Sequence, residues 1–208
     1  MFYILLMDHS KILGVVLAGG KSQRFGEDKS QVKLADKLLI DYILSEIIDE
    51  FNELLIISNN SIEFKKSEKI SVINDFKKDV GPLGGVLTAM KWVKDNNKAY
   101  QWISTFPTDT PFFKNKILKD FFKSIQPQES KLFFIKSNNT RHNIFGLWSL
   151  DLIDKLEEDL DRGKRKIEVW ANNVGVKTIN MEFEKNDPFF NINTKEDLEK
   201  AKENFKND

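Results

Sequence analysis

The chain has 208 residues, and its 32 Lys and Arg balance its 32 Asp and Glu, so the formal net charge is zero. A balanced charge argues against a protein held to nucleic acid or to an anionic membrane by its overall field, because no excess of cations is present to displace counterions. A hydrophobic content of 40 %, with 17 Phe, excludes a disordered chain, and the absence of Cys excludes disulfides and thiolate chemistry.

The length predicts one domain that can bury a core without stabilising disulfides or structural metal ions. The apolar N-terminus, residues 1–7, is short and has no basic residues before it, which does not fit a signal peptide. No segment of the sequence reaches the roughly 20 apolar residues that span a bilayer. We therefore expect a soluble, cytoplasmic protein with neither a membrane nor a nucleic-acid partner.

The first half of the chain alternates short apolar runs with helical stripes of apolar residues. The apolar runs predict strands at 12–17, 54–57, 72–73 and 102–106. Apolar residues recur at helical spacing over 40–51 and 83–93, and Gly81-Pro82 opens the second of these stripes, with Pro in a favourable first-turn position. Alternating strands and helices are typical of a parallel sheet with covering helices.

The second half of the chain is less regular. Apolar runs predict strands at 132–135, 144–148 and 176–183, and helical patterns predict helices at 152–160 and 194–205. Thr194 is the predicted N-cap of the last helix, with Asp197 in the capping box. We expect these elements to extend the same sheet in a single-domain, Rossmann-like, three-layer α/β/α fold with a mainly parallel sheet. A separate lobe at about 130–185 is the alternative.

A glycine-rich, basic segment follows the first predicted strand. Gly19 and Gly20 allow a turn in which backbone N–H groups approach a phosphate, and Arg24 and Lys29 add positive charge. A Walker A motif would need glycine at position 15, where this chain has Val15, and the dinucleotide fingerprint G-x-G-x-x-G is also missing. A glycine turn beside a solvated charge run is the simpler alternative.

The same segment resembles the nucleotidyltransferase signature L-A-G-G-x-S-x-R-[MF]-G-x-D-K. The matching residues are Leu17-Ala18-Gly19-Gly20, Ser22, Arg24, Gly26 and Asp28-Lys29. More narrowly, the chain resembles molybdenum cofactor guanylyltransferases, because V-I-N-D at 72–75 with G-P-L-G-G at 81–85, P-T-D-T-P-F at 107–112 and F-N-I-N-T-K-E-D-L at 190–198 are similar to further elements of that family. The resemblance covers about residues 12–200. We expect a single domain, 1–208, with a nucleotide-binding half at about 12–112 and an acceptor-binding half at about 113–208.

Nucleotidyl transfer attacks the α-phosphate of a nucleoside triphosphate and expels pyrophosphate. It needs an anion cradle, cations for the leaving group and a divalent metal on one or two carboxylates. The turn at Gly19 and Gly20 is the predicted cradle, and Arg24 and Lys29 are the predicted catalytic cations. Asp109 is the predicted catalytic carboxylate and Mg²⁺ ligand, because it directly follows a strand, at the edge where α/β sheets bind ligands. A carboxylate in a local turn is the alternative for Asp109.

The resemblance implies that the donor is GTP. The predicted nucleotide-binding residues are Leu17, Ala18, Gly19, Gly20, Lys29, Asn60, Asp75 and Asp109. Asn60 and Asp75 contribute to the pocket for the base or ribose, and amide and backbone groups suit a guanine edge. Asn60 is preferred to Asn59 because the family pattern after the strand is Ser-x-Asn. A surface acid in a turn is the alternative for Asp75.

The acceptor implied by the resemblance is the terminal phosphate of molybdopterin, in the molybdenum cofactor. A phosphate monoester has a second pKa near ~6, so it is mostly a dianionic nucleophile at neutral pH and needs no general base. The candidate acceptor-binding residues are His142, Lys164, Arg165, Asn191 and Asn193. Ordinary structural roles, including a solvated helix end for the basic pair and a helix approach for the Asn pair, are the alternatives.

The sequence therefore predicts Mg²⁺-dependent transfer of GMP from GTP to the molybdenum cofactor, with molybdoenzyme-maturation proteins as candidate partners. A cytidylyltransferase or sugar-phosphate nucleotidyltransferase of the same fold is one alternative. A non-catalytic nucleotide-binding regulator is another, although the presence of Arg24, Lys29 and Asp109 together favours an enzyme.

Overall fold

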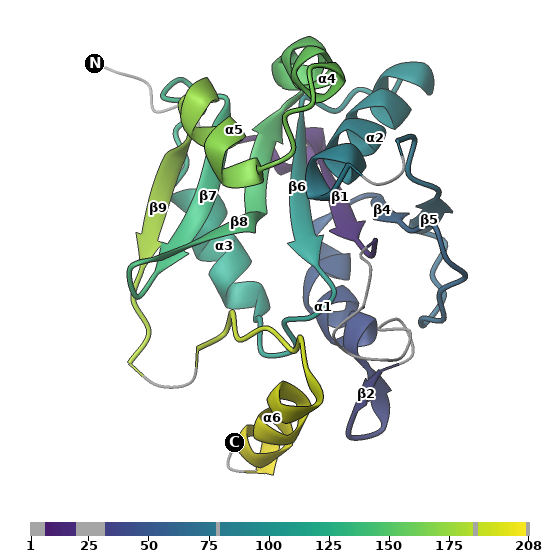
Figure 1. Ribbon diagram of the computed structural model, residues 1–208, viewed down its shortest axis with the longest axis vertical. Helices are drawn as coiled ribbons and strands as arrows, with labels where there is room; N and C mark the ends of the chain where they lie inside the picture. Colours follow the sequence, from purple (N-terminus) through teal and green to yellow (C-terminus); the bar gives the residue numbers. More distant parts are fainter. Residues whose placement is uncertain (1–6, 20–31, 78–79, 185–186, 207–208) are drawn as a thin grey trace.

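The computed structural model describes residues 7–19, 32–77, 80–184 and 187–206. These form one 7-stranded sheet in the order β5-β4-β1-β6-β8-β7-β9 (Figure 1). The strands are β1 (Ile12–Leu17), β4 (Leu54–Ile57), β5 (Ile70–Ile73), β6 (Trp102–Pro107), β7 (Leu132–Ser137), β8 (Thr140–Ser149) and β9 (Lys177–Met181). All neighbours are parallel except at β8, which runs antiparallel to β6 and β7. The predicted mainly parallel sheet is confirmed.

Helices cover both faces of this sheet, which confirms the predicted three layers (Figure 1). One face carries α2 (Pro82–Asp95), α4 (Ile153–Asp161) and α5 (Ile167–Val174), and the other carries α1 (Leu39–Ile47) and α3 (Asn115–Lys123). Short 3-10 turns lie at His9–Lys11, Ile48–Glu50 and Leu150–Leu152. Within the described ranges, no helix has the length and apolar composition of a membrane span.

The central strand β1 explains why its sequence is apolar without alternation. Leu13 and Val15 pack into the cluster under α2, α4 and α5, whereas Ile12 and Val16 pack into the cluster under α1 and α3. All four side chains are at most 1 % exposed. A strand buried on both faces has no polar side to display, which is the reason for the continuous apolar run.

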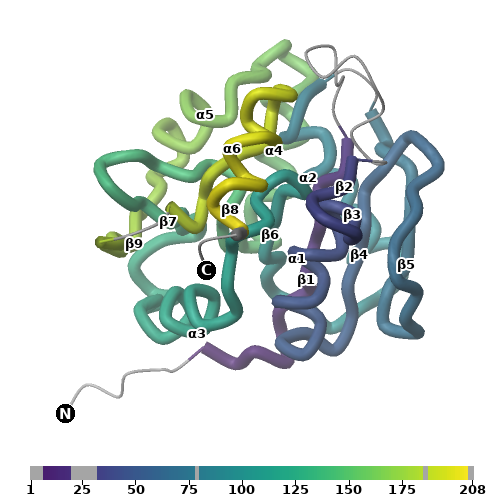
Figure 2. The backbone as a smooth tube through the Cα atoms, turned by 90° about the horizontal axis from the view of Figure 1, so that it is seen from below, coloured from purple at the N-terminus to yellow at the C-terminus, as the bar shows by residue number. Residues whose placement is uncertain are grey.

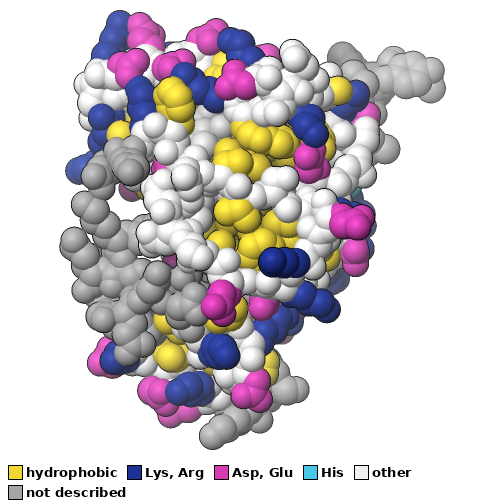
Figure 3. All heavy atoms as spheres, turned by 90° about the vertical axis from the view of Figure 1, so that its right-hand side faces the viewer, with side chains coloured by type: hydrophobic (Ala, Val, Ile, Leu, Met, Phe, Trp, Pro, Cys, Tyr) yellow, Lys and Arg dark blue, Asp and Glu magenta, His cyan; other side chains and the backbone are white. Residues whose placement is uncertain are grey.

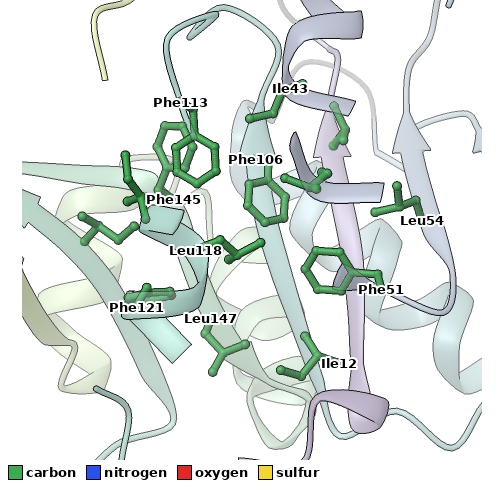
Figure 4. Close-up of a cluster of buried hydrophobic side chains, with 14 of the residues drawn as sticks. Ile12, Ile43, Phe51, Leu54, Phe106, Phe113, Leu118, Phe121, Phe145 and Leu147 are labelled. Carbon is green, nitrogen blue, oxygen red and sulfur yellow. The ribbon is translucent and has the colours of Figure 1, made fainter. Parts of the chain in front are cut away.

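The core beneath α1 and α3 is strongly aromatic (Figure 4). The rings of Phe113 and Phe145 stack with centroids 4.8 Å apart, and Phe106 meets Phe113 edge to face at 6.0 Å. Offset and edge-to-face pairs are the favoured arrangements of such rings. Phe106 and Phe145 lie on the neighbouring strands β6 and β8, so this cluster joins the two halves of the chain.

The alternative of a separate lobe at 130–185 is wrong, because β8 pairs directly with β6 from Trp102 opposite Ser149 to Thr105 opposite Gly146. The sequence patterns do not predict α3, α5 or the small hairpin of β2 (Lys33–Leu34) and β3 (Lys37–Leu38). These elements are short, and short helices depend on tertiary packing rather than on intrinsic propensity.

The C-terminal helix α6 (Lys195–Lys206) lies at the carboxyl end of the parallel strands, beside the β2–β3 hairpin (Figures 1 and 2). The predicted cap of this helix is confirmed: Asp197 N–H donates to Thr194 Oγ1 over 3.1 Å, and Asn193 and Thr194 N–H groups donate to Asp197 Oδ2 over 3.0 Å each. A small apolar cluster joins helix and hairpin, formed by Val32, Leu34, Leu39, Ile192 and Ala201.

The edge strand β5 exposes apolar side chains. Val72 on this strand is 43 % exposed, and Phe76, which follows it, is 62 % exposed. Figure 3 faces this side of the molecule and shows hydrophobic side chains gathered near its centre. Lys91 of α2 lies over the Phe76 ring, 4.4 Å from its centroid, so a cation covers part of this apolar surface.

A buried carboxylate ties α4 to the segment that follows it. Asp159 is fully buried and accepts hydrogen bonds from Lys155, Lys164 and the Trp170 indole N–H. Burial alone would raise the pKa of Asp159, but the hydrogen bonds from the two lysines hold it below its usual value. Trp170 stacks on Trp148 of β8 at 5.9 Å, so the carboxylate also fixes α5 against the sheet.

We expect Asp159→Ala to lower the free energy of unfolding by about 2–3 kcal/mol, because it leaves the buried Trp170 N–H without an acceptor. The two lysines are partly exposed and can regain water, which limits the loss. Urea titration followed by tryptophan fluorescence measures the change. The matched control is Glu158→Ala on the same helix, which removes only an exposed pair with Arg162 and should cost at most ~0.5 kcal/mol. Equal losses in the two variants would contradict this role for Asp159.

Candidate active site

The register of the sheet brings the ends of two separate motifs together. Leu17, the last residue of β1, lies opposite Ile57 of β4 on one side and Pro107 of β6 on the other. Gly19 and Asp109 each follow that paired row by two residues, so both leave the sheet at the same edge and on adjacent strands. The chain passes from β1 to β4 on one side and later returns to β6 on the other, and such a switch point is where open α/β sheets form their ligand crevice.

Of the predicted phosphate-binding segment, the structure describes Leu17, Ala18 and Gly19. Ala18 N–H donates to Ile57 O over 2.9 Å, which extends the parallel ladder, and Gly19 is exposed just beyond it. Among the residues that the structure describes, none would lie within 4 Å of a Cβ atom at Gly19. Gly20, Arg24 and Lys29 lie outside the described residues, and their assigned roles stay predictions.

The first turn of α2 packs closely against the end of β1. A Cβ atom at Gly85 would lie 2.9 Å from Leu17 Cδ2, and one at Gly84 would lie 3.4 Å from Asp75 Oδ1. Gly81 precedes the helix with φ of 71°, a conformation that glycine adopts without strain. The glycines of the G-P-L-G-G motif therefore let α2 approach both β1 and the segment after β5. Its N-terminus, where a helix favours negative charge, lies beside the end of β1.

Asp75 is held in place at the end of β5 by residues from three elements. Its Oδ1 accepts a hydrogen bond from Thr88 Oγ1 of α2 over 2.8 Å and one from Lys77 N–H over 3.3 Å. Its own N–H donates to Asn59 Oδ1, after β4, over 3.0 Å. Burial raises the pKa of Asp75, while the bonds from Thr88 and Lys77 lower it, with burial the larger effect. A half-buried carboxylate with a raised pKa at a sheet edge is typical of a functional group.

The two asparagines after β4 differ in their surroundings. Both asparagines are exposed. The Asn59 side chain supports the backbone of Asp75, whereas Asn60 is positioned through its backbone, since Asn60 N–H donates to Ser58 Oγ and Ser58 Oγ donates to Asn60 O. The exposed side chain of Asn60 is in line with its assignment to the nucleotide. That assignment stays a prediction.

Asp109 and the N-I-N-T motif meet directly, although they are far apart in the sequence. Ile192 N–H donates to Asp109 O over 2.9 Å, which places Asn191 and Asn193 on either side of the residue bonded to Asp109. Oδ1 of the Asp109 carboxylate is buried, while Asn191 and Asn193 are exposed. The side chain of Ile192 is fully buried among residues of α6 and the hairpin, so this small cluster holds the motif against the sheet edge.

The donor set at this point suits Mg²⁺. Carboxylate and amide oxygens are hard ligands, and Mg²⁺ uses few protein ligands because it keeps waters and substrate phosphates. Over the part of the chain that the structure describes, no group of three or more His, Cys, Asp or Glu side chains forms a ready metal cage. One carboxylate next to a segment that carries two asparagines fits an ion that is completed by phosphate oxygens, not an ion enclosed by protein.

His142 lies on β8 in an aromatic setting. Its Nε2 is 2.7 Å from Ser137 Oγ of β7, and its ring stacks on Phe189 with centroids 4.0 Å apart. Burial lowers the pKa of His142, and the negative charge of Asp187 partly raises it. Phe189 stands two residues before Asn191, so His142 supports the segment that carries the N-I-N-T motif. Binding of the acceptor by His142 stays a prediction.

The basic pair at 164–165 is engaged within the fold. Lys164 pairs with the buried Asp159, and Arg165 Nη1 donates to the carbonyl oxygens of Leu160 and Lys164. The bond to Leu160 O adds a second donor to a carbonyl in the last turn of α4, which has no partner within the helix. The structure thus gives both side chains a folding role, and a role toward the acceptor stays untested.

Sequence reasoning missed two residues of this region, Thr88 and Phe189. Thr88 stands one helical turn after Gly84, on the buried face of α2, where a polar residue among apolar ones was the available signal. Phe189 has no comparable signal, because its partner His142 is distant in the sequence.

Curated proteins similar in sequence to this chain are named molybdenum cofactor guanylyltransferases. The probable molybdenum cofactor guanylyltransferase of Halalkalibacterium halodurans is 31 % identical over 199 residues, covering 92 % of this chain and 98 % of that protein. The molybdenum cofactor guanylyltransferase of Nitrobacter hamburgensis is 26 % identical over 191 residues, covering 90 % and 91 % of the two chains.

Solved structures share the fold. Molybdopterin-guanine dinucleotide biosynthesis protein A from Archaeoglobus fulgidus superposes with a TM-score of 0.72 at 24 % identity, covering 94 % of this chain and 100 % of that one. The 4-diphosphocytidyl-2C-methyl-D-erythritol synthase from Anaerococcus prevotii gives 0.73 at 12 % identity, covering 97 % and 98 %. The profile of the MobA-like NTP transferase domain matches residues 14–174, and the chain belongs to that family, which makes it a nucleotidyltransferase.

Proposed function

We propose that the protein transfers GMP from GTP to the terminal phosphate of the molybdenum cofactor, with release of pyrophosphate. The observation that carries the proposal is the shared edge of β1 and β6, where Gly19, Asp109 and the segment of Asn191 and Asn193 lie together. The names of the curated relatives supply the donor and the acceptor. In this proposal the half at about 12–112 binds the nucleotide and the half at about 113–208 binds the acceptor.

The reaction joins an oxygen of the acceptor phosphate to the α-phosphorus of GTP and breaks the bond from that phosphorus to the bridging oxygen of pyrophosphate. The acceptor is already mostly dianionic at neutral pH, so the chain needs no base to remove a proton. Its residues then act by binding and orientation, with the backbone at Leu17, Ala18 and Gly19 facing the nucleotide.

Arg24 and Lys29 are assigned to the phosphates of GTP, where positive charge favours departure of pyrophosphate. Asp109 would hold Mg²⁺, with Asn191 and Asn193 beside it. The ion, when bound, neutralises charge on the phosphates and aligns them for attack. Asn60 and Asp75 hold the nucleoside, and His142 orients the segment on the acceptor side.

We expect Asp109→Asn to lower the rate of pyrophosphate release by roughly 100-fold or more, because an amide cannot supply the negative charge that the ion needs. The matched control is Asp120→Asn on α3, where an exposed carboxylate pairs only with Lys116 and activity should be kept. Circular dichroism checks that both variants are folded. Full activity in Asp109→Asn would remove the basis of the assignment.

A panel of GTP, CTP, UTP and ATP with Mg²⁺ and the molybdenum cofactor tests the donor. We expect the guanine dinucleotide to be the main product, since Asn60 and backbone groups suit the donors and acceptor of a guanine edge. Mass spectrometry of the product gives the answer. A preference for CTP would instead identify a cytidylyltransferase of this fold. Tight nucleotide binding without any product would identify a regulator.

We expect Asp75→Asn to weaken GTP binding while leaving the melting temperature at pH 7 equal or higher. Since burial raises the folded pKa of Asp75 above its unfolded value of 3.8, the folded protein binds more protons between these values. The stability that this extra proton binding gives the folded protein is therefore lost as the pH rises from 3.8 through the folded pKa of Asp75. Melting curves from pH 4 to 7 should show a shallower loss of stability with rising pH in the variant. A lower melting temperature at pH 7 would show that Asp75 is a structural residue.

A further inference from the structure

We propose that Thr88 of α2 is a positioning residue for the donor nucleotide, which it serves by fixing the carboxylate of Asp75. Thr88 touches no reacting group in this proposal, and it acts only through Asp75. The inference rests on the proposed function, because it takes Asp75 to be a ligand of the nucleoside.

The first support is the burial of a hydroxyl that packing does not require. Thr88 is only 4 % exposed and lies on the face of α2 that packs into the apolar core, among neighbours such as Leu87 and Met90. Valine has the same shape and would fill this site without a polar atom. A buried hydroxyl costs free energy unless it is hydrogen-bonded, so its partners indicate its role.

The second support is that the Thr88 hydroxyl donates one hydrogen bond and accepts another, and both partners lie in the segment after β5. Thr88 Oγ1 donates to Asp75 Oδ1 over 2.8 Å and accepts Phe76 N–H over 2.8 Å. The hydroxyl thus fixes the carboxylate and the following peptide together. Asn59 Oδ1 holds the preceding peptide by accepting Asp75 N–H over 3.0 Å, so Asp75 is fixed on both sides.

The third support is which oxygen remains for a ligand. Both donors to the carboxylate, Thr88 Oγ1 and Lys77 N–H, approach Oδ1. Throughout the described ranges of the chain, no donor is bonded to Asp75 Oδ2. This oxygen can accept from a nucleoside donor, either an N–H group of the base or a ribose hydroxyl. The closeness of Gly84 to Asp75, and of Gly85 to Leu17, places the carboxylate beside the predicted nucleotide turn.

The charges around Asp75 bear on its protonation. Lys77 follows in the same segment and pairs with Asp161 of α4, and Lys91 of α2 pairs with Glu157 of α4. These lysines are already neutralised by acids, so the hydroxyl of Thr88 is the nearest group that favours the ionised carboxylate. Removing the hydroxyl should raise the pKa of Asp75 and make binding fail at a higher pH.

The experiment compares wild type, Thr88→Val, Thr88→Ser and a control for loss of a buried hydroxyl, Ser149→Ala. Ser149 is also 4 % exposed and accepts a local hydrogen bond, from Asp151 N–H, but it lies where β8 pairs with the start of β6, at the opposite end of the sheet. The measurements are KM and kcat for GTP, and calorimetric GTP binding, from pH 5 to 8. Binding is repeated with ITP, which lacks the amino group, and with 2′-deoxy-GTP.

We expect Thr88→Val to raise KM for GTP about tenfold with a much smaller change in kcat, which corresponds to loss of one hydrogen bond to a charged group. The acid limit of binding should move to higher pH in Thr88→Val, and Thr88→Ser should restore both properties. Ser149→Ala should behave as wild type. A smaller effect of Thr88→Val with ITP assigns Oδ2 to the base, and a smaller effect with 2′-deoxy-GTP assigns it to the ribose.

An unchanged KM and pH limit in Thr88→Val would overturn the inference, as would an equal defect in Ser149→Ala or a failure of Thr88→Ser to restore binding. These results differ from failure of the proposed function, in which wild type itself forms no guanine dinucleotide from GTP and the cofactor.

Discussion

The parallel placement of β1 between β4 and β6 is the constraint on which the rest of the site depends. Because Leu17 ends in register with both Ile57 and Pro107, the segments that follow three strands must emerge at one edge. The apolar side chains of β1 are buried on both faces, so a shift in register would carry a large cost in buried surface. The hydrophobic core therefore fixes the geometry of polar groups that contribute little to it.

Two sets of packing and hydrogen-bond contacts fix the polar groups at this edge. At the end of β5, the glycines of α2 allow close packing, and Thr88 and Asn59 fix Asp75. At the end of β6, Ile192 bonds to the backbone of Asp109 and is itself held by the cluster of α6 and the β2–β3 hairpin. Both sets of contacts fix groups at this edge before a substrate binds, which reduces the ordering that the substrate must impose.

The structure also separates charges that serve folding from charges available to ligands. Lys164 and Arg165 are candidate acceptor-binding residues in the sequence, and in the structure these exposed side chains also meet Asp159 and the end of α4. A buried acid such as Asp159 needs cations and hydrogen bonds around it, and this requirement accounts for Lys155 and Lys164 together. The His142 ring likewise contacts Ser137 and Phe189, so it supports the segment that leads into the N-I-N-T motif.

The sequence by itself determined the fold class, the family and most strands, because apolar runs, glycine turns and the L-A-G-G and N-I-N-T motifs are local signals. It also determined the caps of α2 and α6, since Gly81-Pro82 and Thr194 with Asp197 act within a few residues. Only the tertiary structure decided that the second half joins the same sheet, that Asn59 and Thr88 hold Asp75, and that Ile192 reaches Asp109. These contacts join residues far apart in the chain, and their geometry follows from strand order and register, which no local pattern encodes.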